Sequence, residues 1–105
     1  MFLKDGFTCK LTIRARGHFP EMMVTYRLAL PERVYEWRGA REAAKDQKAR
    51  FRLDATFLCE HVLQWDAAAE IKVESIKHLA PFALTEILDA ICGYSFDDQA
   101  DGEKN

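Results

Sequence analysis

Two consecutive stretches of alternating apolar and polar residues near the start of the chain constrain the fold most. In the first, the residues of one face are Phe7, Cys9, Leu11, Ile13 and Ala15. In the second, they are Val24, Tyr26, Leu28 and Leu30. A period of two residues is typical of a strand with one buried face. The short connection at residues 17–21 contains glycine and proline, so we expect an antiparallel β-hairpin.

After the second stretch the apolar period becomes that of helices. Pro31 suits the first turn of a helix, and Val34 and Trp37 supply a short apolar stripe. Gly39 is expected to end or loosen this helix, and residues 41–50 to form an exposed helical turn or a linker. Residues 49–65 predict a long helix, because apolar side chains recur there at three- and four-residue steps.

Two further helices are expected before the chain ends. Residues 74–80 predict a short helix that stops before Pro81, where a last helix starts and runs to a cap at Gly93. Its apolar face is formed by Leu84, Ile87, Leu88 and Ile91. The sequence therefore predicts an α+β domain over residues 1–95, an N-terminal antiparallel β-hairpin followed by three or four α-helices. Residues 96–105 are acidic and non-periodic, and are expected to form a disordered tail.

Charge is distributed unevenly along the 105 residues, although the formal net charge is only −2. Residues 10–52 contain eleven Lys and Arg against five Asp and Glu, whereas residues 53–105 contain three against eleven. Such asymmetry is found in nucleic-acid surfaces and acidic interaction tails, and also where complementary halves face each other or other copies of a chain. Because the basic residues are scattered, we favour complementary halves.

The cysteines and the hydropathy indicate a cytoplasmic protein with no membrane partner. Cys9, Cys59 and Cys92 are widely spaced and form no Cys-x-x-Cys pair, as expected of reduced cysteines. No apolar run approaches the ~20 residues that span a bilayer. The first residues also lack the basic segment and apolar run of a secretory signal.

No sequence pattern assembles a catalytic, metal or cofactor site. Cys59 and His61 would lie roughly 200° apart around a helix, so they cannot share a metal ion. His18 and His78 stand alone, and the five glycines are isolated, so there is no phosphate-binding loop. We therefore expect a protein that is not an enzyme and uses no metal or cofactor.

Nucleic acid is the partner class that the basic first half suggests. Lys10, Arg14 and Arg27 would decorate the polar side of the hairpin, and further basic residues follow in the helical region. The acidic second half and a sequence pI near 5.9 disfavour nucleic acid as the partner. A small DNA-binding regulator remains one alternative.

The order of segments resembles that of a known family. The segments are MVTYRLALPERVYEW (23–37), LCEHVLQWD (58–66), IKVESIKHLAPFAL (71–84) and ILDAICGY (87–94). This order is similar to that of the tail assembly chaperones of tailed phages and prophages, over residues 22–95. Those proteins have a helix ending in Trp-Asp, a linker, a valine, a leucine followed by proline, and a terminal helix ending in glycine.

The resemblance implies a non-enzymatic role in tail morphogenesis. Tail assembly chaperones coat the long tape measure protein and help recruit tail tube subunits around it. If this chain does the same, its contacts would be exposed apolar side chains, and we expect Tyr35, Trp37, Phe82 and Tyr94 to make them. A structural tail or head–tail component of the virion is a further alternative. The open edges of a hairpin also make a homo-oligomer possible.

Overall fold

The computed structural model describes residues 7–67 and 69–93, which form three strands and four helices. In chain order the elements are β1 (Thr8–Ile13), β2 (Met22–Arg27), α1 (Pro31–Ala43), α2 (Gln47–His61), β3 (Val62–Trp65), α3 (Val73–Ile76) and α4 (Pro81–Ile91). The predicted α+β fold, with a hairpin ahead of the helices, is confirmed. The segment expected to be a disordered tail lies outside the described residues.

The hairpin has the register that the alternation predicts. Leu11 lies opposite Val24, and both side chains are buried, whereas Thr12 and Met23 lie opposite each other on the other face. The pairing extends beyond the strands to a two-residue turn, where Arg16 and Phe19 exchange backbone hydrogen bonds of 2.9 Å. Gly17 occupies the first central position of this turn with φ 58°, a conformation that favours glycine.

The sheet contains a third strand where the sequence predicts the end of a long helix. Helix α2 ends at His61, and β3 pairs antiparallel with β2 in the order β1-β2-β3. Val62 and Trp65 continue the three- and four-residue apolar spacing of α2, and this is why residues 49–65 resemble one helix. Pairing with β2 satisfies the backbone groups along one edge of the strand and packs Val62 and Trp65 against the core, so tertiary contacts override the local pattern.

The first helix is longer than expected. Helix α1 continues through Gly39 to Ala43, and only residues 44–46 separate it from α2. Asp46 caps α2, because its side chain accepts a 2.8 Å hydrogen bond from the backbone N–H of Ala49. The expected short helix over 74–80 is a single turn at Val73–Ile76, and Ile76 is its buried residue.

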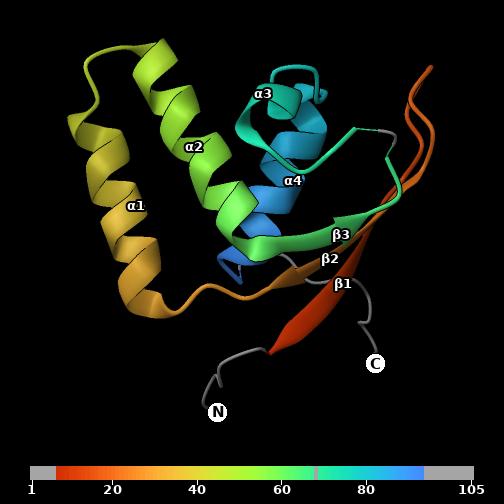
Figure 1. The fold of residues 1–105 in the computed structure, drawn as a ribbon, viewed down its shortest axis with the longest axis horizontal. Coiled ribbons are helices and arrows are strands. Elements are labelled where there is room, and N and C mark those ends of the chain that lie inside the picture. Colours follow the sequence, from red (N-terminus) through yellow and green to blue (C-terminus); the bar gives the residue numbers. More distant parts are fainter. Residues whose placement is uncertain (1–6, 68, 94–105) are drawn as a thin grey trace.

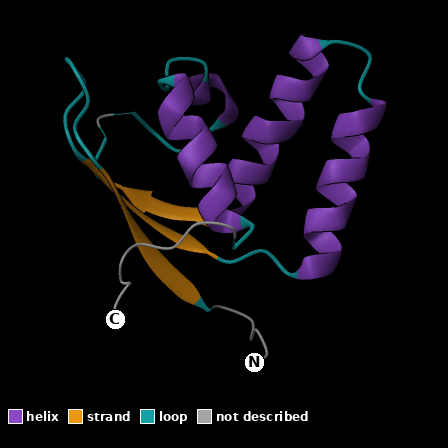
Figure 2. Ribbon diagram, turned by 180° about the vertical axis from the view of Figure 1, so that it is seen from behind, coloured by secondary structure: helices purple, strands orange, loops and turns teal. Residues whose placement is uncertain are grey.

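The helices lie on one side of the sheet (Figures 1 and 2). Helix α4 packs against β1 and β2, and α2 packs against α4 and β3. Helix α1 lies beyond α2, farther from the sheet, and the molecule measures 42 × 38 × 20 Å (Figure 1). The largest fully buried side chains are Tyr26, Phe57, Ile13, Leu58, Ile76, Ile87, Ile91 and Val24.

The buried face predicted for the second strand is wrong at its last residue. Leu30 follows the alternation of β2 but is exposed, and its neighbour Ala29 is buried instead. The backbone leaves the strand at this point, because the N–H of Ala29 donates to the carbonyl oxygen of Ile91 at the end of α4. This hydrogen bond attaches the end of the last helix to the start of the β2–α1 connection.

Replacing two glycines by alanine, one inside α1 and one after α4, is expected to change the free energy of unfolding in opposite directions. Gly39 lies inside α1 with open space around its Cα, so Gly39→Ala should stabilise the protein by about 0.5–1 kcal/mol. Gly93 follows α4 at φ 82°, so Gly93→Ala should cost about 1–2 kcal/mol. Urea unfolding of the two variants tests both signs. A stabilising Gly93→Ala would contradict the assignment of this residue as the helix cap.

Candidate protein-binding site

The aromatic residues that the sequence singles out lie in different surroundings. Tyr35 projects from α1 and is 70% exposed, so it is free to contact a partner. Trp37, two residues later, is half-buried, and its ring stacks on Phe57 of α2 at 4.5 Å between centroids. The structure therefore places one side of α1 in solvent and the other against α2.

Phe82 lies in the first turn of α4. The tip of the hairpin covers part of its ring: Phe19 packs edge-on at 5.6 Å, and the Arg16 guanidinium lies 4.4 Å from the ring centroid. Arg16 also contacts Glu86 at 3.7 Å. Phe82 thus serves a contact within the molecule and does not join Tyr35 in one surface. Tyr94 lies outside the described residues.

A polar cluster that the sequence did not indicate joins α1 to α2. Asp54 is 5% exposed, and its carboxylate accepts hydrogen bonds from Trp37 Nε1 at 3.1 Å and from Arg41 Nε and Nη2 at 2.7 and 3.1 Å. The hydrogen bond to Asp54 raises the pKa of Arg41. We call Trp37, Arg41 and Asp54 the α1–α2 clamp. It holds the two helices at a fixed separation.

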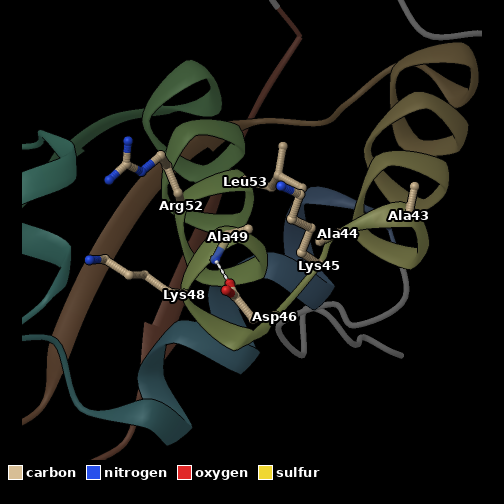
Figure 3. A pocket seen from close by; sticks show the side chains of 8 residues that line it. All are labelled: Ala43, Ala44, Lys45, Asp46, Lys48, Ala49, Arg52 and Leu53. Atoms are coloured by element: carbon tan, nitrogen blue, oxygen red, sulfur yellow. Dashed lines mark hydrogen bonds between the residues drawn. The ribbon is translucent and has the colours of Figure 1, made fainter.

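A groove opens at the connection between these two helices. Its volume is about 540 Å³, and its lining residues are Ala43, Ala44, Lys45, Asp46, Lys48, Ala49, Arg52 and Leu53. We call it the elbow groove (Figure 3). Alanine and leucine side chains provide apolar surface between α1 and α2, while the long basic side chains extend from its sides (Figure 3).

The elbow groove could not be predicted from the sequence, because its surface depends on how α1 and α2 are arranged. Residues 41–50 have low apolar content, and a reading by periodicity assigns them to an exposed turn or a linker. The alanines become a surface only because α1 and α2 turn back on each other around them. The useful signal is alanine interspersed with Lys and Arg at a helix–helix connection.

The cysteines and the buried histidine are poorly suited to catalysis. Burial raises the pKa of the Cys92 thiol to about 11, and burial also raises the pKa of Cys9 and of Cys59, so none is an activated thiolate. His61 is buried, and Nδ1 donates to the Phe57 carbonyl oxygen at 2.8 Å. In residues 7–67 and 69–93, no three His, Cys, Asp or Glu side chains gather as metal ligands would. The helices of the same residues include none with the length and apolar character to cross a membrane.

His61 is expected to make stability depend on pH. Burial lowers its pKa in the folded protein. The hydrogen bond to the Phe57 carbonyl oxygen and the charge of Glu60 raise this pKa by less, whereas the charges of Arg33 and Arg27 lower it further. The unfolded chain therefore takes up the proton first as pH falls below about 6.5. The free energy of unfolding should then fall by at most about 1.4 kcal/mol per pH unit, until the folded-state pKa is reached.

Urea unfolding at neutral and mildly acidic pH checks this expectation. The variant His61→Gln should lose the part of the slope below about pH 6.5 that its imidazole causes. The control His78→Gln replaces an exposed histidine and should keep that slope. Equal slopes in the wild type and His61→Gln would contradict the assignment.

Comparison of the chain with protein families, curated proteins and solved structures finds no match.

Proposed function

We propose that this protein is a tail assembly factor of a phage or prophage, a chaperone that binds helical segments of the tape measure protein in the host cytoplasm. The observation that carries the proposal is the elbow groove, which offers apolar surface between two helices at the surface of a small α+β domain. The order of segments in residues 22–95 resembles that of tail assembly chaperones and supports this proposal, except that Trp65 ends a strand and not a helix.

The groove is suited to a helix. An amphipathic helix docks by placing side chains at positions i, i+3 or i+4 and i+7 into an apolar groove. Ala44, Ala49 and Leu53 are small or medium apolar residues, so a partner helix can approach closely. The α1–α2 clamp fixes the walls before binding, which reduces the ordering cost of association. Tyr35 lies on the outer side of α1 and is available for a further contact.

Co-purification with neighbouring gene products tests the function. The tagged protein is expected to capture a long, helix-rich protein of tape-measure type. The variant Leu53→Asp, which places a charge on the groove floor, should abolish this capture. Leu63→Asp is the matched control, because Leu63 is 48% exposed on β3 and outside the groove. Circular dichroism of both variants is the test that they fold.

The outcomes distinguish an error in the proposed binding site from an error in the proposed function. If Leu53→Asp still captures the partner, the contact lies elsewhere on the protein. If the wild type captures no such partner, the proposed chaperone function is rejected. Presence of the protein in purified phage particles would instead indicate a structural tail or head–tail component.

The basic side chains of the elbow groove support a second function, that of a small DNA-binding regulator. Lys45, Lys48 and Arg52 extend from one surface region and could contact phosphates. Retention on duplex DNA that falls steeply with salt would favour this alternative.

A further inference from the structure

The elbow groove has an ordered distribution of charge around its apolar floor. On α2, Ala49 and Leu53 are four residues apart and form one row along the helix surface. Lys48 and Arg52 form the adjacent row and extend toward the side of α3 (Figure 3). Lys45 lies on the other side, between α1 and α2 (Figure 3). Basic side chains therefore flank the apolar row on both sides.

These cations have little compensation within the molecule. In residues 7–67 and 69–93, Lys45 and Lys48 form no ion pair, and Arg52 has only a longer-range influence on Glu74. Asp46 is the one carboxylate that lines the groove, and it caps α2 by accepting a hydrogen bond from the backbone N–H of Ala49. The groove thus presents three cations and one occupied carboxylate.

Two arginines of α1 behave differently. Arg33 of α1 forms a bidentate pair with Glu60, at 2.9 and 3.0 Å. Arg41 pairs with the buried carboxylate of Asp54. These two arginines thus have carboxylate partners in the chain, and Arg50 of α2 donates to the carbonyl oxygen of Arg41 at 3.5 Å. Within the part of the chain that the structure describes, the cations around the elbow groove have no such contact, and they are available to carboxylates of another molecule.

We propose that the partner segment bound by the elbow groove is an acidic amphipathic helix. Its small apolar residues lie over Ala44, Ala49 and Leu53, and its Asp or Glu residues flank that stripe and pair with Lys45, Lys48 and Arg52. This inference rests on the proposed function and adds the chemistry of the partner. It distinguishes acidic helical stretches of a long partner from its neutral or basic ones.

Designed peptides test the proposal independently of any phage protein. The probe is a helical peptide of about 16 residues, four to five turns, with an Ala/Leu stripe flanked by Glu. A second peptide has Gln in place of every Glu, and a third has Lys. Fluorescence anisotropy against the full chain at about 0.15 M salt is expected to show binding of the Glu peptide about tenfold tighter than of the Gln peptide, with none for the Lys peptide.

Matched protein variants locate the interaction. The triple variant Lys45→Gln, Lys48→Gln, Arg52→Gln is expected to weaken Glu-peptide binding about tenfold and to leave Gln-peptide binding unchanged. The control Lys10→Gln, Arg14→Gln, Lys72→Gln removes the same number of positive charges from the hairpin and the segment before α3, and should change neither affinity more than about twofold.

Several results would overturn the inference. Equal binding of the Glu and Gln peptides would remove the charge preference, and equal loss in both triple variants would show a general effect of net charge. Tighter binding of a DNA duplex than of the Glu peptide, lost in the groove variant, would make phosphate the ligand. A gain of more than tenfold when Asp97, Asp98, Asp101 and Glu103 are replaced by Asn or Gln would make the chain's own terminus the occupant. Failure of tape measure capture with the peptide preferences intact would reject the proposed function and leave this inference standing.

Discussion

Phe57→Ala is expected to lower the free energy of unfolding by about 3–5 kcal/mol, the largest effect of any single substitution considered. Phe57 is fully buried in α2 and contacts two side chains of α1 and one of α2. Trp37 stacks on it with 9° between the ring planes, the His61 ring lies at 4.6 Å, and the Arg33 guanidinium lies at 5.2 Å. Removal of the ring therefore leaves a cavity and also withdraws the surface on which α1 packs.

Urea unfolding followed by far-UV circular dichroism and by tryptophan fluorescence measures this loss. The matched control is Phe51→Ala, a half-buried phenylalanine on the same helix, which should lose less than half as much. If Phe57→Ala does not fold, Phe57→Leu retains most of the apolar volume and should cost about 1–2 kcal/mol. Equal losses for Phe51→Ala and Phe57→Ala would contradict the central position given to Phe57.

The hairpin and the last helix could be predicted because each is defined by a strong local period. Leu11, Val24 and Tyr26 are buried where the alternation places them. In α4 the apolar residues Ile87 and Ile91 are fully buried, and Gly93 follows the helix with a positive φ, as expected of a cap. In these segments the local preference and the tertiary environment favour the same structure.

The third strand could not be predicted because its four residues fit two structures. Val62, Leu63 and Trp65 serve equally as the end of an apolar helical stripe or as a short strand. The choice is made by β2, whose edge opposite β1 pairs with these residues and places Val24 opposite Trp65. That partner lies about forty residues earlier in the chain, and no pattern local to α2 contains this information.

The polar parts of the candidate site were also beyond prediction. Asp54 lies within the apolar region of α2, where a carboxylate is normally excluded, and only the contact with Trp37 and Arg41 explains it. Trp37, which the sequence predicts to contact a partner, stacks on Phe57 and donates a hydrogen bond to Asp54 within the molecule. The elbow groove depends on how two helices meet, and its residues are separately unremarkable in the sequence.

Asp54→Ala is expected to lower the free energy of unfolding by about 2–4 kcal/mol. Its carboxylate accepts three hydrogen bonds, two of them from a charged guanidinium, and it connects α1 to α2 almost completely shielded from water. The Arg41 side chain is 41% exposed and regains water when its partner is lost, which keeps the effect below that of a fully buried ion pair. Because the clamp fixes the walls of the elbow groove, the variant should also bind the Glu peptide less tightly.

Glu60→Ala provides the matched control for Asp54→Ala. Glu60 also accepts two hydrogen bonds from an arginine of α1, but its side chain is 42% exposed, so its loss should cost less than about 1 kcal/mol. A double-mutant cycle between Asp54→Ala and Arg41→Ala, measured by urea unfolding, isolates the interaction of the pair. A coupling near zero, or equal losses for Asp54→Ala and Glu60→Ala, would show that burial of the carboxylate does not determine how strongly α1 is held. In that case the walls of the elbow groove would depend on the other contacts between α1 and α2, foremost the stacking of Trp37 against Phe57.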